Sequence, residues 1–278
     1  MSDLILSPKP DDPKLSASVS GFDQTGAPVE TRVVTERALT LYLNRQEIVT
    51  MMTIGDHPKL LAVGYLANQN MLEPDNPIIG VDYDDDLGVV VVRTRRETDF
   101  EEKLKKKIRT SGCAQGTIFG DVMERFEDVK LSGSTVLSGR VLRNLLKTIN
   151  TMPSLYLTAG AIHGCVLAQD DIPIVYMEDV GRHNAVDKIA GWMRLNGCDP
   201  ADKIFYTTGR LTSEMVIKCV MMEIPILVSR SGFTAWGVDL ARSAGLTLIG
   251  RARGARFTVL SGEERVMFDS QPVSETAP

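Results

Sequence analysis

The sequence predicts an α/β protein in which a mostly parallel or mixed sheet carries helices on both faces. Short apolar runs alternate with amphipathic stretches through its second half, and strands separated by single helices are typical of such sheets with right-handed crossovers. The predicted strands are 174–177, 204–207, 226–229 and 246–250, and the predicted helices are 183–195, 212–222 and 234–244.

The first half is predicted to form a smaller, strand-rich unit. Apolar and polar residues alternate over 39–43, which is typical of a half-buried strand. Apolar runs at 78–81 and 89–92 flank a turn-rich DYDDDLG segment and predict a hairpin. Residues 57–72 predict a short helix with Pro58 in its first turn.

The middle of the chain changes character twice. Residues 98–109 predict a charged amphipathic helix, and the small, polar residues 110–121 predict an exposed loop that carries Cys113. Ser138 then predicts the cap of a further helix. The apolar positions of that helix are Val141, Leu142, Leu145, Leu146 and Ile149.

These patterns give four predicted regions. Residues 1–30 are rich in Pro, Asp, Ser and Gly and are expected to form a flexible tail. A small strand-rich domain is expected over 31–120, ending in the Cys113 loop. An α/β ligand-binding domain over 121–265, with a last strand from Phe257, precedes a second tail over 266–278.

Composition excludes several classes of protein. The 278 residues carry a net charge of -5 and a pI near 5.4, so nonspecific binding to nucleic acid or to a membrane surface is not expected. The sequence shows neither a long apolar segment nor a signal peptide. Its four cysteines form neither a disulfide framework nor a metal knuckle. We therefore expect a reduced, cytoplasmic protein.

The candidate binding residues follow the predicted strands, where an open α/β sheet binds its ligands. Each of the four loops 178–184, 207–213, 229–234 and 250–256 contains Gly and Arg. Glycine admits a ligand to the backbone, helix N-termini attract anions, and guanidinium groups match phosphate oxygens. The candidates are Arg182, His183, Asn184, Asp187, Gly209, Arg210, Ser213, Ser229, Arg230, Ser231, Thr234, Arg251, Ala252, Arg253, Gly254, Ala255 and Arg256.

Together the four loops predict a polyanionic ligand, such as a nucleotide or a phosphorylated cofactor. The alternative is that the arginines are solvated charges or pair with Glu178 and Asp179. His183 is interpreted either as an acid, base or hydrogen-bond donor to the ligand, or as a histidine satisfied by a carbonyl group or by Asp187. No metal site is predicted: His163 lacks the His-x-Glu and Cys-x-x-Cys pattern of zinc deaminases.

Cys113 is the candidate nucleophile. It follows a basic run of Lys103, Lys105, Lys106, Lys107 and Arg109, and nearby cations favour the reactive thiolate. Cys165 and Cys219 lie in apolar stretches typical of a core, and Cys198 lies in a turn.

Long motifs in the chain resemble the formate dehydrogenase accessory sulfurtransferase (FdhD) family. They are TERALTLYLN, MMTIGDHPKLLAVGYLANQNML, MEDVGRHNAVDKIAG and the run from TTGRLTSEMVIK to GRARGARFTVL. The resemblance spans about residues 31–262 and implies a cytidine-deaminase-like larger domain without zinc chemistry.

The resemblance also implies a function. A cysteine desulfurase would load Cys113 with persulfide sulfur. The protein, a homodimer, would bind the molybdenum bis-guanine-dinucleotide cofactor and transfer sulfur to it for formate dehydrogenase or a related molybdenum enzyme.

One departure from the family pattern bears on that function. The family commonly has Cys-x-x-Cys at the loop, and this chain has Gly116 in place of the second cysteine. A single thiol still suffices to carry a persulfide, whereas an internal disulfide cycle has no second thiol. A cofactor-binding chaperone that does not move sulfur is the second hypothesis. An unrelated nucleotide-dependent enzyme is the third.

Overall fold

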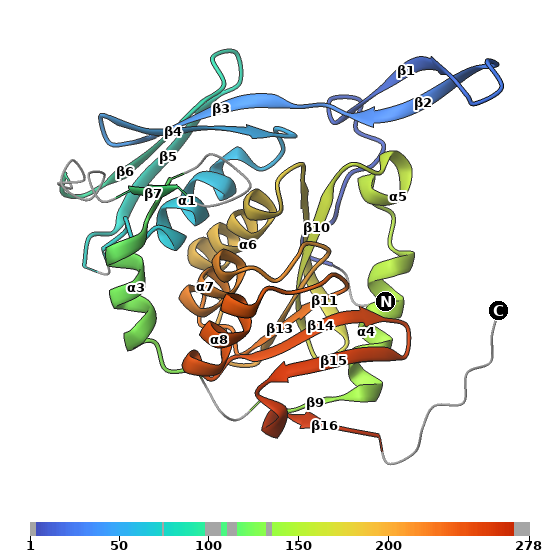
Figure 1. Cartoon of the computed structure of the whole chain (residues 1–278). Coiled ribbons are helices and arrows are strands. Elements are labelled where there is room, and N and C mark those ends of the chain that lie inside the picture. The colour runs from blue at the N-terminus through green and yellow to red at the C-terminus, as the bar shows by residue number, and fades with distance from the viewer. Residues whose placement is uncertain (1–3, 74, 98–106, 110–115, 132–134, 270–278) are drawn as a thin grey trace.

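A six-stranded mixed sheet forms the centre of the molecule. The computed structural model describes residues 4–73, 75–97, 107–109, 116–131 and 135–269 (Figure 1). The strands lie in the order β11-β10-β12-β13-β14-β15. Their bounds are β10 (His163–Gln169), β11 (Ile172–Asp179), β12 (Lys203–Thr207), β13 (Ile226–Ser229), β14 (Thr247–Arg253) and β15 (Arg256–Ser261).

The strand directions explain why the sheet is mixed. β12, β13 and β14 are parallel neighbours, as predicted. β10 lies between β11 and β12 and is antiparallel to both, so β11 points the same way as β12. β15 returns antiparallel along β14. Four strands, β11 to β14, therefore end at one edge of the sheet.

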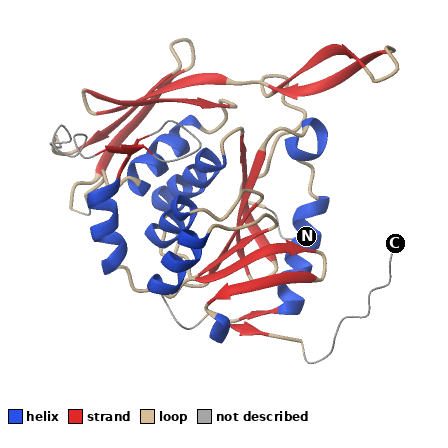
Figure 2. Ribbon diagram, in the orientation of Figure 1, coloured by secondary structure: helices blue, strands red, loops and turns tan. Residues whose placement is uncertain are grey.

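Helices cover both faces of this sheet, as predicted (Figure 2). α6 (Arg182–Asn196), α7 (Ser213–Met221) and α8 (Ala235–Ala244) lie on one face, and α4 (Gly139–Thr151) lies on the other. Successive strand residues point to opposite faces: Phe205 packs with α6 and α7, and Tyr206 packs with α4. The predicted cap of α4 is also confirmed, because Ser138 Oγ accepts the Val141 N–H at 3.2 Å.

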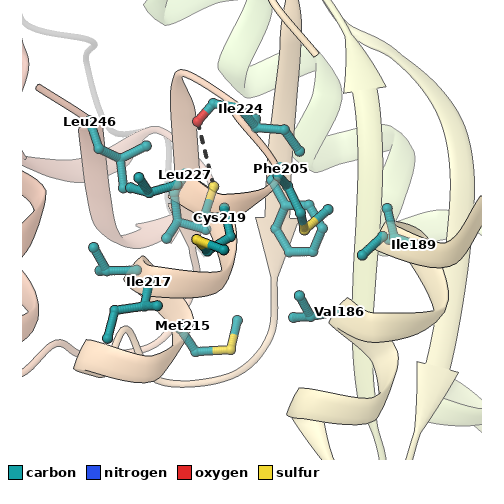
Figure 3. Close-up of a cluster of buried hydrophobic side chains, with 14 of the residues drawn as sticks. Val186, Ile189, Phe205, Met215, Ile217, Cys219, Ile224, Leu227 and Leu246 are labelled. Atoms are coloured by element: carbon teal, nitrogen blue, oxygen red, sulfur yellow. Dashed lines mark hydrogen bonds between the residues drawn. The ribbon is translucent and has the colours of Figure 1, made fainter. Parts of the chain in front are cut away.

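Cys219 is a residue of α7 and lies in the core cluster that α7 shares with α6 (Figure 3). Its side chain is 1% exposed, and its Sγ lies 3.7 Å from the carbonyl oxygen of Ile224. Phe205 and Leu227 belong to the same cluster. The sequence-based assignment of this cysteine to the core is confirmed.

A second sheet has the order β4-β3-β6-β5 and is covered by a helix. The elements are β3 (Arg37–Leu43), β4 (Gln46–Thr53), α1 (Pro58–Asn68), β5 (Ile78–Asp84) and β6 (Val89–Thr94). The predicted strand at 39–43, the hairpin and the helix that begins at Pro58 are therefore confirmed. The other side of α1 packs on α6, with Gly64 against the Asp187 carbonyl and Gly191 against the Leu60 carbonyl.

Part of the segment expected to form an N-terminal tail adopts regular structure, because residues 16–22 and 28–30 lie in strands. Ile5 donates its N–H to the Ile174 carbonyl at 3.0 Å, beside the edge strand β11. β1 (Ser16–Phe22) and β2 (Pro28–Val34) pair as an antiparallel ribbon that extends away from the two large sheets (Figure 1). Asp23 makes the turn between them, because its Oδ1 accepts the N–H groups of Thr25 and Ala27 at 2.8 and 3.1 Å.

Short elements complete the described chain. They are β7 (Lys107–Arg109), β8 (Gly116–Ile118), α3 (Phe119–Asp128), β9 (Leu137–Ser138), α5 (Leu155–Ala159), a 3-10 turn (Glu263–Arg265) and β16 (Val266–Met267). β8 and the start of α3 occupy the second half of the expected 110–121 loop. β16 pairs with β9, so the expected tail after residue 265 begins with a strand. Most of the expected helix over 98–109 lies outside the described residues. Across the described ranges, every helix is too short or too polar to cross a membrane.

Candidate ligand-binding site

The sequence-predicted loops meet at the edge where β11, β12, β13 and β14 end. Neighbouring strands lie about 4.8 Å apart, so the loops follow one another along this edge in the strand order. The structure divides them into two groups. One group surrounds a cavity near β13, β14 and β15, and the other lies near β10, β11 and β12.

The first group forms an open cavity of about 1060 Å³ that we call the arginine cavity. It is lined by Arg230, Ser231, Gly232, Arg251, Arg253, Ala255, Arg256, Phe257, Thr258, Val259 and Phe268. Four of these side chains are guanidinium groups, and no described lining residue is acidic. Such a surface favours an anionic ligand.

Local backbone interactions hold these arginines in place. The Arg251 N–H donates to the Ser231 carbonyl at 2.9 Å, and Arg253 Nε donates to the Arg230 carbonyl at 3.2 Å. Arg251 has a φ of 53°, an uncommon conformation for a residue with a side chain. Gly254, with a φ of 56°, forms the turn between β14 and β15. The loops after β13 and β14 are therefore tied together.

Aromatic side chains accompany the arginines and were missed by sequence reasoning. The Arg251 guanidinium lies 5.3 Å from the centre of the Phe233 ring, and Arg230 lies 5.4 Å from that of Tyr156. Phe257 and Phe268 line the cavity, and Phe268 is 59% exposed. The exposed ring of Phe268 and the half-buried ring of Phe257, beside guanidinium groups, suit the stacking of a flat heterocycle. The sequence signal that could have revealed these rings is the presence of Phe257 and Phe268 after the arginine-rich segment 250–256.

The second group gathers around Arg182, the first residue of α6. Arg182 packs along Gly209, where an added Cβ would lie 2.7 Å from Arg182 Cδ. His163 is half-buried, with Nδ1 3.3 Å from Thr208 Oγ1. Burial lowers the pKa of His163, and the positive charges of Arg182 and Arg210 lower it further.

His183 has a different neighbour from the one considered in the sequence. Its Nε2 lies 3.3 Å from Glu214 Oε2, without the alignment of a hydrogen bond. Burial lowers the pKa of His183, and the nearby Glu214 carboxylate opposes the change. The imidazole is therefore predominantly neutral at pH 7.

Two further candidates, Asn184 and Asp187, connect protein segments. Asn184 Nδ2 donates to the Met52 carbonyl at 2.8 Å and to Asp179 Oδ1 at 3.0 Å. Asp187 accepts from Asn68 Nδ2 at 2.7 Å and forms an ion pair with Lys218 at 2.6 Å. Both side chains are buried, so they support the fold of this edge.

The adjacent Lys188 extends the buried network. Its Nζ pairs with Asp179 at 2.6 Å and also with Asp56, which precedes α1. Burial opposes the charge on Lys188, but the two carboxylates outweigh it and raise the pKa of Lys188. Asp179 also accepts the Thr53 hydroxyl at 2.5 Å. These contacts join β4 and the β4–α1 loop to the six-stranded sheet.

The remaining candidates shape the loops. Ser229 Oγ donates to the Gly209 carbonyl at 2.6 Å and accepts the Ser231 N–H at 2.9 Å. Thr234 caps α8 by accepting the Gly237 N–H at 3.2 Å. Ser213 is the half-buried first residue of α7. Ala252 is 2% exposed and packs in the core cluster that includes α4, and the ligand-contacting role expected for it stays a prediction.

Cys113, the predicted nucleophile, lies outside the described residues. Among the described cysteines, Cys165 and Cys219 are buried and Cys198 is partly exposed. Burial raises the pKa of Cys165 to about 12 and also raises that of Cys198. Within the described ranges, no group of three or more His, Cys, Asp or Glu side chains is arranged to hold a metal ion.

Comparison with known proteins places this architecture in a family. The profile of the FdhD/NarQ family matches residues 34–267. A protein of Wolinella succinogenes named sulfur carrier protein FdhD is 30% identical over 252 residues, covering 88% of this chain and 86% of the relative. A protein of the same name from Bacillus subtilis is 30% identical over 243 residues, covering 86% and 91%.

A solved structure has the same fold. The crystal structure of a putative formate dehydrogenase accessory protein from Desulfotalea psychrophila superposes with a TM-score of 0.74 at 25% identity. The match covers 91% of this chain and all of that one. On the extent of the family match and of these relatives, the chain belongs to the FdhD/NarQ family.

Proposed function

We propose that this protein is a sulfur carrier that serves the maturation of a formate dehydrogenase or a related molybdenum enzyme. The arginine cavity is the single observation that carries the ligand assignment: four arginines and two phenylalanine rings border one open space of about 1060 Å³. The names of relatives that align over most of this chain support the sulfur-carrying part of the proposal.

The ligand we propose is the molybdenum bis(molybdopterin guanine dinucleotide) cofactor, bound as the client of the carrier. Each guanine dinucleotide arm has a pyrophosphate and a flat base. Arg230, Arg251, Arg253 and Arg256 offer guanidinium forks to the phosphates. Phe257 and Phe268 offer rings to the base. The reasoning follows from the lining chemistry of the cavity.

We assign the sulfur chemistry to Cys113. Its thiolate attacks the outer sulfur of a persulfide on a cysteine desulfurase, which breaks the S–S bond of the donor and releases the donor cysteine as a thiolate. In the second step the outer sulfur of the Cys113 persulfide passes to the metal centre of the client. The metal supplies two electrons that reduce this sulfur to sulfide, and Cys113 returns as a thiolate.

Several finer features belong to the same proposal. The protein acts in the cytoplasm as a homodimer, without nucleic acid or membrane. Its regions divide near residue 120, and the larger one is similar to cytidine deaminases. The alternative function is a chaperone that binds the cofactor without moving sulfur. Gly116, in place of the second cysteine of the family motif, is the observation that favours this alternative.

Intact-protein mass spectrometry separates the two functions. The protein is incubated with a cysteine desulfurase, pyridoxal phosphate and L-cysteine, and a mass increase of one sulfur atom is expected on the wild type. Cys113→Ala should abolish the adduct. Cys198→Ala is the matched control, because Cys198 is the partly exposed thiol among the described cysteines, and this variant should still be loaded.

The opposite results are equally informative. No adduct on the wild type, with an active desulfurase, would exclude the carrier role and leave the cofactor chaperone. An adduct lost in Cys198→Ala but kept in Cys113→Ala would move the carrier role to the turn before β12.

A further inference from the structure

Arg182 is a buried cation for which the described residues provide no hydrogen-bonding partner. Its side chain is 9% exposed, and its Nε and Nη2 atoms are buried without a hydrogen bond. Removing a guanidinium group from water without a partner is costly, and such groups are normally paired. Lys188 and Lys218, the buried lysines of the same helix-packing region, each have a carboxylate partner. Arg182 therefore differs from its neighbours.

The surroundings of Arg182 are cationic and rich in donors. Gly209 packs on Arg182 and is followed by Arg210, and His163 Nδ1 lies 3.3 Å from the Oγ1 atom of Thr208, the residue before Gly209. The charges of Arg182 and Arg210 contribute to the lowered pKa of His163. Glu214, the acid beside this group, lies 3.3 Å from His183. Thr212 Oγ1 is also buried without a hydrogen bond, three residues after the Gly209 that supports Arg182.

Two helices begin beside Arg182, and their first turns meet where His183 Nε2 lies 3.3 Å from Glu214 Oε2. α6 starts at Arg182 and α7 at Ser213, and neither has a side-chain cap. Their first N–H groups and dipoles favour an anion. A buried guanidinium with free donors, flanked by uncapped N-termini of helices of 15 and 9 residues, has the composition of an oxyanion site.

We propose that Arg182, with His163, Arg210 and Thr212 around it, forms a second oxyanion-binding site, separate from the arginine cavity. Its ligand class is a phosphate group. The arginine cavity lies at β13, β14 and β15, whereas this site lies at β10, β11 and β12 on the same edge. At about 4.8 Å per strand, their centres are about three strands, or roughly 14 Å, apart. One ligand with two separated phosphate groups can occupy both sites. This shared occupancy rests on the proposed function, whereas the existence of the second site does not.

Titration calorimetry with inorganic pyrophosphate tests the site. The wild type is expected to bind two equivalents per chain. Arg182→Gln should weaken one of them about ten- to a hundredfold, the usual effect of losing a charge-assisted hydrogen bond. Arg251→Gln should weaken the other. Arg140→Gln, an exposed change on α4, is the matched control and should leave both unchanged.

A second variant tests the geometry while keeping the charge. Gly209→Ala places a methyl group 2.7 Å from Arg182 Cδ and must displace the side chain. The same equivalent of pyrophosphate should be weakened as in Arg182→Gln. Thermal unfolding without ligand provides the contrast with a structural role: Arg182→Gln should melt at or above the wild-type temperature and lose part of the stabilisation by pyrophosphate.

Either of two results would overturn the proposal. A lower melting temperature of Arg182→Gln with unchanged pyrophosphate binding would make Arg182 a structural residue solvated by ordered water. Binding of one equivalent that only Arg251→Gln weakens would leave the arginine cavity as the single anion site. Failure of sulfur loading on Cys113 would leave this test unaffected, so the two proposals fail separately.

Discussion

Replacing Glu178 by glutamine should change the pH dependence of stability. Glu178 is 2% exposed, and its two carboxylate oxygens accept the N–H groups of Leu155 and Tyr156 at 2.8 and 2.9 Å. Burial raises the pKa of Glu178 to about 7, although these two hydrogen bonds oppose the change. The carboxylate therefore fixes the start of α5 while being costly to ionise.

The sign of the effect follows from proton binding. Between pH 4.5 and 7 the folded protein holds a proton on Glu178 that the unfolded chain has released. Stability therefore falls as pH rises through this window, opposite to the usual behaviour of a salt-bridged carboxylate. A shift from 4.5 to about 7 corresponds to about 3 kcal/mol of unfolding free energy. Glutamine is uncharged like the protonated acid and lacks this dependence, although its Nε2 cannot accept the second N–H.

Urea denaturation at pH 5 and pH 8 measures the effect. The unfolding free energy of Glu178→Gln relative to wild type should rise by about 3 kcal/mol from pH 5 to pH 8. A pH-independent loss accompanies this rise, because glutamine can accept only one of the two N–H groups. Glu127→Gln, an exposed change on α3, should alter stability little at either pH. A glutamine variant whose stability relative to wild type falls as pH rises would refute the reasoning.

Two further predictions concern the contact between the two sheets. Gly64→Ala would push a methyl group into the Asp187 carbonyl and should lower the unfolding free energy measured by urea denaturation by about 3 kcal/mol or more. Gly21→Ala is the control, because its added Cβ meets nothing within 4 Å. Equal stability of the two variants would contradict the packing. Lys188→Met leaves Asp179 and Asp56 without their buried cation and should cost about 3 to 5 kcal/mol. The melting temperature should recover in part in the double variant Lys188→Met/Asp179→Asn. A single variant that melts at the wild-type temperature would refute the pairing.

The α/β core was predictable because local patterns and tertiary structure agree there. The apolar run at 204–207 lies within β12, and the periodic stretch at 183–195 lies within α6. β10 was missed because its sequence, HGCVLAQ, shows no strand alternation and gives no sign that it inserts between β11 and β12. Both faces of a central strand are buried, which removes the alternation on which the prediction depends.

The N-terminal ribbon was missed for another reason. Residues 1–30 have the polar, turn-rich composition of a tail, and β1 buries little beyond Ser16. Its structure comes from pairing with β2, from the Asp23 turn and from Leu15, which packs in a small core cluster. Such long-range pairing has little local signal.

The sequence predicted the residue types of the candidate site but not the separation of its four loops into two groups. The sequence placed the glycines and arginines of four loops at one edge, but their separation into two groups depends on β10, which carries His163 to that edge beside Thr208. Asp187 was expected near the ligand because it is four residues from His183. Its actual partners, Asn68 and Lys218, come from other helices. The spacing of residues along a single helix cannot predict such contacts between helices.

The glycine contact between α1 and α6 has a consequence for how a large ligand can enter. Sliding of packed helices relies on interleaved side chains that change rotamer, and Gly64 and Gly191 have none; the main chains themselves touch there. A relative displacement would force carbonyl groups into collision and would separate Lys188 from Asp56. The two sheets should therefore behave as one rigid body, so that access to the carboxyl edge depends on rearrangement of the surrounding loops.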